Sequence, residues 1–328
     1  MTARILALAA VSSLSLACGD DSGTGMELGD APPLPPTWTL MSVPTEAQLL
    51  GVWGQTSSAA WAVGWDGTVL AWDGLGWNLE STTATVPLTD VAGPPDGSSG
   101  PFAVGWEGTL LQRTGGVWMD APRTTTTSVD LSGVFFLEDG TGLAVGDEGT
   151  VLIWEGIQWA EADFSIISEL SGERVRPRTA LSGVWGAAGR WYISGAGGAS
   201  FAGVPGDFEA LDTRESVPLR GVWGVSRNEV YCVGLDGLIL RLGGRWRRDA
   251  SDLPRTFMFG VWGRNDDDVT AVGWSGTVAR RVGGTWMLET VERSVDLRDV
   301  WVDALTGFAV AVGARGTILT RTSSVTLP

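Results

Sequence analysis

The sequence predicts an all-β protein, a seven-bladed β-propeller of four-stranded antiparallel blades, on three observations. A Gly-x-x-Gly element recurs seven times, with steps of 41, 41, 49, 39, 39 and 40 residues between first glycines. A step near 40 residues is the period of a four-stranded propeller blade. Short apolar strands flank each element. The N-terminal region also contains a strand that the last repeat lacks, which lets the ring close.

The Gly-x-x-Gly elements are expected to be hairpins between the second and third strands of each blade. Glycine supplies the positive φ that a tight hairpin needs. The seven elements are Gly64-Trp65-Asp66-Gly67, Gly105-Trp106-Glu107-Gly108, Gly146-Asp147-Glu148-Gly149, Gly195-Ala196-Gly197-Gly198, Gly234-Leu235-Asp236-Gly237, Gly273-Trp274-Ser275-Gly276 and Gly313-Ala314-Arg315-Gly316.

Large aromatic residues recur at equivalent places in the first and fourth strands, which predicts packing between blades. The first-strand set is Trp53, Trp185, Trp223, Trp262 and Trp301, and the fourth strands open on Trp77, Trp118, Trp159, Phe208, Trp246 and Trp286. The seventh repeat has no fourth strand of this kind. Thr37-Trp38-Thr39-Leu40 matches Thr285-Trp286-Met287-Leu288. The N-terminal strand is therefore expected to complete the last blade and pair both free sheet edges.

The N-terminus predicts export. Residues 1–17 combine one Arg with an apolar run too short to span a bilayer, as in a signal peptide. Leu14-Ser15-Leu16-Ala17-Cys18 resembles a bacterial lipobox, although ordinary cleavage before Cys18 is also possible. Residues 18–36 are then a lipidated Cys and a flexible acidic, Pro-rich tether, and residues 37–328 the propeller. We expect an outer-membrane lipoprotein, periplasmic or facing the cell surface, with a secreted protein as the alternative.

Composition excludes several classes of function. The net charge is −16, and the basic residues, 22 in all, are arginines. An acidic chain is a poor ligand for nucleic acid, because phosphate binding needs a basic surface. The membrane contact is expected through the lipid anchor alone. The chain has no His, which removes the usual general base and the commonest metal ligand. Cys232 lies in an apolar run and is expected to be a buried, inert thiol.

The repeated Val52-Trp53-Gly54, Ala62-Val63-Gly64 and Gly67-Thr68 sequences resemble those of BNR-like propeller lipoproteins of bacterial envelopes. They are also similar to the photosystem II assembly-factor propellers, which are lumenal, lipid-tethered and non-catalytic. The resemblance covers about residues 38–328 and implies a seven-bladed fold with an assembly or binding role. The Asp-box of the sialidase branch is lost, and its Phe/Tyr-Arg-Ile-Pro motif is absent. The resemblance therefore carries over no catalytic Arg.

The turns supply the first candidate binding site. Trp65, Trp106 and Trp274 occupy a position where other repeats have Asp, Ala or Leu, so this position is expected to face solvent. In ring order, blades six, seven, one and two are consecutive. Asp66 and Glu107 lie beside the tryptophans, and Arg315 comes from blade seven. Exposed aromatics beside charged groups suit a protein partner or a sugar, although each Trp could instead lie flat on its own hairpin.

The long connection 161–180 supplies the second candidate site. It contains Arg174, Arg176 and Arg178, a basic cluster in an acidic protein. Long connections in compact domains are often functional, and this one is expected on the same face as the turns. A tolerated surface insertion is the alternative.

Two other patterns predict no site. Asn265-Asp266-Asp267-Asp268 falls in a turn between strands, where Asn and Asp are ordinary turn formers, so we expect no metal and no cofactor. The carboxylates Asp66, Glu107 and Glu148 lie on neighbouring turns but lack the features of a glycosidase pair.

The leading hypothesis is therefore a non-catalytic, monomeric, envelope-anchored propeller that recognises another envelope protein through one face. A lectin-like module that binds cell-surface glycan is the first alternative. A glycoside hydrolase or lyase that works without His is the second.

Overall fold

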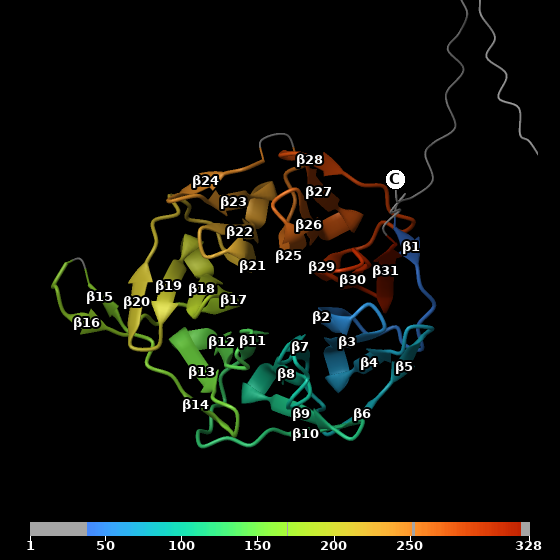
Figure 1. Ribbon diagram of the computed structural model, residues 1–328, viewed down its shortest axis with the longest axis horizontal. Helices are drawn as coiled ribbons and strands as arrows, with labels where there is room; N and C mark the ends of the chain where they lie inside the picture. The colour runs from blue at the N-terminus through green and yellow to red at the C-terminus, as the bar shows by residue number, and fades with distance from the viewer. Residues whose placement is uncertain (1–37, 169, 251–252, 323–328) are drawn as a thin grey trace, which may run out of the picture. The chain divides into compact units, whose positions relative to one another are not determined.

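The computed structural model describes residues 38–168, 170–250 and 253–322, which lie in one compact unit. These residues form seven antiparallel sheets arranged in a ring, as predicted (Figure 1). The fold is a seven-bladed β-propeller. In each blade the first strand lies next to the central axis, and the second and third strands follow it toward the outside.

The first three blades follow one another in the chain. Blade 1 contains β2 (Leu49–Thr56), β3 (Ala59–Gly64), β4 (Val69–Trp72) and β5 (Trp77–Leu79). Blade 2 contains β7 (Leu88–Ala92), β8 (Phe102–Gly105), β9 (Leu110–Thr114) and β10 (Val117–Asp120), and β6 (Ser81–Thr82) pairs in parallel with β10. Blade 3 contains β11 (Leu131–Phe136), β12 (Gly142–Gly146), β13 (Thr150–Trp154) and β14 (Trp159–Glu161).

The next three blades repeat this order. Blade 4 contains β17 (Leu181–Ala187), β18 (Arg190–Gly195), β19 (Ser200–Val204) and β20 (Asp207–Ala210), with the added strands β15 (Ile166–Ile167) and β16 (Arg174–Val175). Blade 5 contains β21 (Leu219–Ser226), β22 (Glu229–Gly234), β23 (Ile239–Leu242) and β24 (Trp246–Arg248). Blade 6 contains β25 (Met258–Asn265), β26 (Asp268–Gly273), β27 (Val278–Val282) and β28 (Thr285–Leu288).

Blade 7 joins the two ends of the described chain, which confirms the predicted closure. It contains β29 (Leu297–Val302), β30 (Ala309–Gly313) and β31 (Thr317–Arg321), and its outer strand is β1 (Thr39–Leu40). β1 pairs antiparallel with β31, with Thr39 opposite Thr320 and Leu40 opposite Leu319. Thr37, part of the predicted strand, lies outside the described residues.

The Val-Trp-Gly motif packs one blade against the next. A side chain at Gly54 would bring its Cβ within 2.6 Å of the Trp301 ring of the preceding blade. Gly224 faces Trp185 in the same way, and Gly263 faces Trp223. The glycine therefore lets a neighbouring indole lie directly on the backbone, as expected of a position that contacts a ring so closely. Trp185, Trp223 and Trp301 are buried, as predicted.

A second contact between blades recurs at three interfaces, and we call it the carboxylate clamp. In each clamp, a carboxylate three residues after the fourth-strand Trp of one blade accepts the Nε1–H of the fourth-strand Trp of the next. It also pairs with an Arg from the third strand of that next blade. The clamps are Glu80 with Trp118 (2.8 Å) and Arg113 (2.6 Å), Asp249 with Trp286 (2.7 Å) and Arg281 (3.1 Å), and Glu289 with Trp38 (2.6 Å) and Arg321 (2.9 Å).

Where the clamp carboxylate is missing, the facing indole has no acceptor. Met41, Ala121 and Leu211 occupy the clamp position at three other interfaces. The Nε1 atoms of Trp77, Trp159 and Trp246, which face these positions, have no hydrogen-bond partner among the described residues. A buried donor without an acceptor is costly, so the three clamped interfaces are the better satisfied ones.

Candidate functional site

The Gly-x-x-Gly turns lie at one end of the ring and have nearly the same geometry in every blade. Six of them are single tight turns: η1 (Trp65–Gly67), η2 (Trp106–Gly108), η3 (Asp147–Gly149), η4 (Ala196–Gly198), η5 (Leu235–Gly237) and η6 (Trp274–Gly276). Each turn lies against the first strand of the following blade. The first residue after the leading glycine donates its N–H to the segment that enters its own blade, as from Trp65 to the Gln48 carbonyl (2.9 Å).

The backbone of these turns corrects one expectation about glycine. The leading glycine is extended, with φ −171° at Gly64, and only the closing glycine has positive φ, at 65° for Gly67. The second variable residue is also left-handed, at φ 56° for Asp66 and Glu107 and 57° for Arg315. This conformation is uncommon outside glycine, and it turns these three side chains outward, where all are exposed.

The turn tryptophans of blades 1 and 2 meet. Trp65 is 42% exposed and Trp106 is 41% exposed, which agrees with the expected solvent-facing position. Their ring centroids lie 5.9 Å apart with the planes at 57°. Neither lies flat on its own hairpin in isolation, because each contacts the other. Together they form an exposed aromatic surface, which we call the Trp65–Trp106 platform.

Trp274 belongs to a separate aromatic cluster within blade 6. It is 36% exposed, and its ring centroid lies 3.8 Å from that of Phe257. Phe259 lies 6.1 Å from the same ring and carries the Arg298 guanidinium at 4.4 Å from its own centroid. The predicted arc of blades 6, 7, 1 and 2 is thus consecutive around the ring, but its aromatic residues fall into two groups.

The second candidate region does not form a free basic loop. β15 and β16 pair antiparallel, and β15 also pairs in parallel with β20, so the two strands extend the outer edge of blade 4 (Figure 1). Arg174 donates to the Gly206 carbonyl and pairs with Asp207 at 3.3 Å, and Arg176 pairs with Glu161. Arg178 is exposed beside the turn of blade 3. The hairpin uses two of the three arginines to attach itself to the ring.

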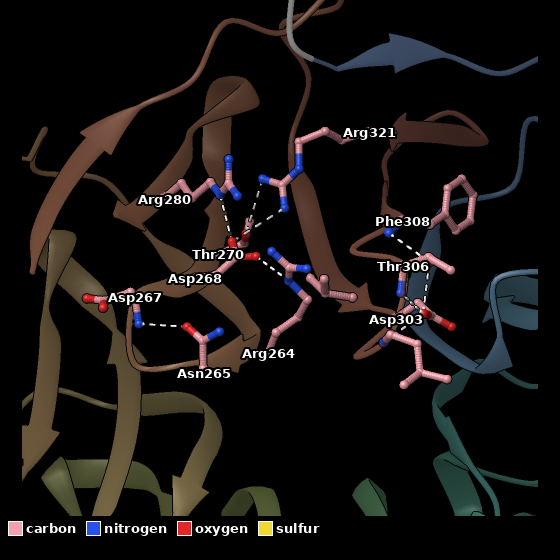
Figure 2. Close-up of polar contacts among 12 residues, drawn as sticks. Arg264, Asn265, Asp267, Asp268, Thr270, Arg280, Asp303, Thr306, Phe308 and Arg321 are labelled. Carbon is pink, nitrogen blue, oxygen red and sulfur yellow. Dashed lines mark hydrogen bonds and ion pairs between the residues drawn. The ribbon is translucent and has the colours of Figure 1, made fainter. Parts of the chain in front are cut away.

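The Asn265-to-Asp268 turn has a structural role, as the sequence predicted (Figure 2). Asn265 Oδ1 accepts the Asp267 N–H at 2.9 Å, which closes an Asx turn. Asp268 is buried and pairs with Arg264 at 2.5 Å and Arg280 at 2.7 Å. Burial raises its pKa, but the two guanidinium groups more than offset this and hold the pKa below its usual value. Within the described residues, no group of three or more His, Cys, Asp or Glu could hold a metal ion.

Sequence analysis missed a cavity at the centre of the ring. It has a volume of about 370 Å³ and is lined by the first strands of all seven blades, together with Trp106. Two carboxyl groups, Asp90 from β7 and Asp299 from β29, line it. Five blades have Gly at the equivalent position, as at Gly51 in blade 1. This departure from the repeat was the signal that could have found the two acids.

A β-bulge directs each of these carboxylates to a neighbouring blade. The strand register shifts just before both residues, and bulges commonly redirect a side chain. Asp90 Oδ2 accepts the Val134 N–H of blade 3 at 2.8 Å, and Asp299 Oδ2 accepts the Val52 N–H of blade 1 at 2.9 Å. Asp90 also accepts the N–H of Val91 (2.8 Å). The acids therefore link the inner strands of adjacent blades.

The two carboxyl groups titrate far from their ordinary range. Burial raises the pKa of Asp90 to about 7, although the N–H groups of Val134 and Val91 act in the opposite direction. Burial and the nearby Asp90 carboxylate raise the pKa of Asp299 well above its usual value. Neither acid forms an ion pair with an arginine in the described ranges, so no positive charge stabilises their ionised forms.

No protein-family model matches the chain, and no curated protein matches it. Solved structures do match in fold. The WD40 β-propeller domain of Doa1 has a TM-score of 0.70 at 14% identity, covering 88% of this chain and 96% of that one. YCF48 from Cyanidioschyzon merolae has a TM-score of 0.67 at 18% identity, covering 87% and 98%. YCF48 bound to D1 peptide has a TM-score of 0.70 at 15% identity, covering 88% and 97%. At these identities the likeness shows the fold.

Proposed function

We propose that this protein is a binding propeller, not an enzyme, and that it recognises another protein through the face that carries the Gly-x-x-Gly turns. The Trp65–Trp106 platform carries the proposal. Two large indoles remain about two-fifths exposed beside the exposed charges of Asp66 and Glu107. Exposed Trp next to charged groups is typical of binding hot spots. One structural neighbour is YCF48 bound to D1 peptide, which supports a protein partner.

The chemistry of the cavity favours binding over catalysis. Both acids have backbone N–H groups bound to their carboxylate oxygens. These hydrogen bonds fix both carboxylates to the ring, which suits a fixed contact with a bound group better than proton transfer to and from a substrate. The exposed turn carboxylates lie in water. The fold itself does not decide the matter, since propellers serve many functions.

A pull-down from native envelope extract tests the proposal. The bait is the propeller, and the variant carries Trp65→Ala, Trp106→Ala and Trp274→Ala. A matched control carries Leu75→Ala, Ile157→Ala and Leu305→Ala, which remove exposed apolar side chains from turns at the opposite end of the ring. We expect one specific protein to be captured by the wild type and the control and lost with the Trp variant. Equal capture by all three would refute the proposed face, and capture of glycan would favour the lectin alternative.

We also propose that the propeller is anchored in the envelope through a lipid on Cys18. The support is the signal-like segment and lipobox-like sequence, which lie outside the described residues. No helix within the described residues is long and apolar enough to cross a membrane. Expression in a Gram-negative host should place the wild type in the membrane fraction, with a diacylglyceryl group on the N-terminal peptide by mass spectrometry. Cys18→Ser should release the protein, and an unmodified wild-type N-terminus would contradict the anchor.

A further inference from the structure

The turns of blades 1 to 3 form an acidic sector of the turn face. On the turns of blades 1 to 3, the acids Asp66, Glu107 and Glu148 are exposed. Burial and the neighbouring charges of Asp130 and Glu148 raise the pKa of Asp147, which shows that negative charge is crowded here. The cavity lining also carries two cations, Arg220 from blade 5 and Arg298 from blade 7.

The acidic sector leads into the central cavity. Trp106 belongs both to the Trp65–Trp106 platform and to the cavity lining, so the two surfaces are continuous. Asp90 and Asp299 line the cavity beside blade 1. Gly51 of blade 1 packs closely against the Asp90 backbone, since a Cβ there would come within 2.7 Å of the Asp90 Cα.

The two acids have acceptor capacity left for a cation. A carboxylate offers about four lone-pair sites, and the backbone N–H groups use only part of them. Arg298 lies over Phe259 at 4.4 Å and Arg220 reaches solvent, so neither pairs with the acids. The burial of two acids without a positive charge is unfavourable when they ionise. A cation supplied by a bound partner would stabilise the ionised form of both carboxylates.

We propose that the protein partner inserts a lysine or arginine side chain from a basic segment into the central cavity, against Asp90 and Asp299, while the rest of the segment lies on the Trp65–Trp106 platform. This rests on the proposed function and names the chemistry of its partner. The face of Trp106 at the cavity edge suits a cation. The turn acids of blades 1 and 2 and the net charge of −16 attract a basic segment. Four cations on this face oppose it. Arg220 and Arg298 line the cavity, Arg123 donates to the Gly108 carbonyl, and Arg315 is exposed on the turn of blade 7.

Selection from a random linear peptide library displayed on phage tests the inference. The immobilised targets are the wild type, Asp90→Asn with Asp299→Asn, Trp65→Ala with Trp106→Ala, and the control Asp139→Asn, an exposed acid at the opposite end of the ring. We expect the wild type and the control to select peptides with Lys or Arg at one fixed position. The double Asn variant should select peptides without this preference, and the double Ala variant should lose selection.

The outcomes separate the two proposals. Selection of peptides with no basic preference by the wild type would overturn the inference and leave the proposed function standing. Failure of the wild type to select any peptide would overturn both. Retention of the basic preference by the double Asn variant would overturn the role of the cavity acids.

A double-mutant cycle then measures the contact. The probe is the most strongly selected peptide, labelled for fluorescence polarisation, and its counterpart with the basic residue changed to Gln. We expect the change to Gln to weaken binding to the wild type at least about tenfold and to have less than about twofold effect on the Asn variant. Equal losses for both proteins would contradict the contact. Wild-type affinity should also rise between pH 6 and pH 8, as the acids ionise, and the Asn variant should show no such rise.

Discussion

Asp90 and Asp299 show how one residue can depart from a repeat and keep the fold. The other five blades have Gly at this position, and in each of the two departures a carboxylate takes up an N–H group of the next blade. The contact holds whether the acid is protonated or ionised, because at least one oxygen remains an acceptor. The ionised form is the costly one, since no arginine pairs with it in the described part of the chain.

The stability of the ring should therefore depend on Asp90 in a specific direction. An unfolded Asp has a pKa near 3.9, and the folded value is about 7. Between these values the folded state holds a proton that the unfolded state has released, so stability falls as pH rises. Asp90→Asn should remove this part of the slope, at most about 4 kcal/mol between pH 4 and pH 8. Urea unfolding across this range measures it, and an unchanged slope in the variant would disprove the assignment.

The thiol of Cys232 is buried, as the sequence predicted. It is fully buried in β22, and burial raises its pKa far above the ordinary value. A neutral, inaccessible thiol should resist alkylation. We expect no iodoacetamide adduct on the folded protein and complete reaction at Cys232 in denaturant, as measured by mass spectrometry. Reaction in the folded state would show that blade 5 opens readily.

At the scale of a strand, the sequence predicted the features that recur in most blades, but it did not reveal the carboxylate clamp, which recurs at only three interfaces. The turns, the Val-Trp-Gly strands and the closing strand were predicted because seven copies reveal which residues the geometry demands. The β15–β16 hairpin was missed because it occurs once. Asp90 and Asp299 were missed because each is a single exception to glycine. The exposure of Trp65 and Trp106 followed from the variability of their position, but their mutual contact depends on how close two blades come.

Removing the carboxylate of one clamp should lower the stability of the ring substantially. Glu80→Ala removes the acceptor of the Trp118 indole and the partner of Arg113. The loss should be about 2–4 kcal/mol, because an indole N–H and part of a guanidinium are left unpaired. Glu155→Ala, at an exposed position, is the control and should change stability by less than about 0.5 kcal/mol. Chemical denaturation measures the stability of both variants. A loss for Glu80→Ala as small as that for Glu155→Ala would show that the clamp contributes little to stability.

At the scale of the whole ring, the seam between β1 and β31 is reinforced by a clamp. Trp38 is fully buried, donates to Glu289, and lies 5.0 Å from the Arg321 guanidinium. Arg321 also reaches Asp268 at 3.9 Å, which ties the seam to blade 6 (Figure 2). Only two residue pairs join β1 to β31, so side chains must carry much of the closure.

Trp38→Ala should therefore strongly weaken the closure of the ring between β1 and β31. Replacing a buried Trp by Ala typically lowers the free energy of unfolding by about 3–5 kcal/mol. The charged groups of Glu289 and Arg321 would also lose their contact with the indole. Hydrogen exchange should rise first at β1 and β31, with blades 3 and 4 still protected. Uniform loss of protection across all seven blades would instead mean that closure and global folding are inseparable.

The seam also sets the order of events during synthesis. β1 is made before blades 1 to 6 and its partner β31 after them, so the pairing of Thr39 with Thr320 must wait until all of these blades have been translated. Such distant pairing slows folding, and domains that fold during synthesis can only complete what has already emerged. Blades 1 to 6 can each form from consecutive residues, whereas blade 7 cannot. A nascent chain thus carries an unpaired β1 until β31 has been made, and the ring can be sealed only after that point.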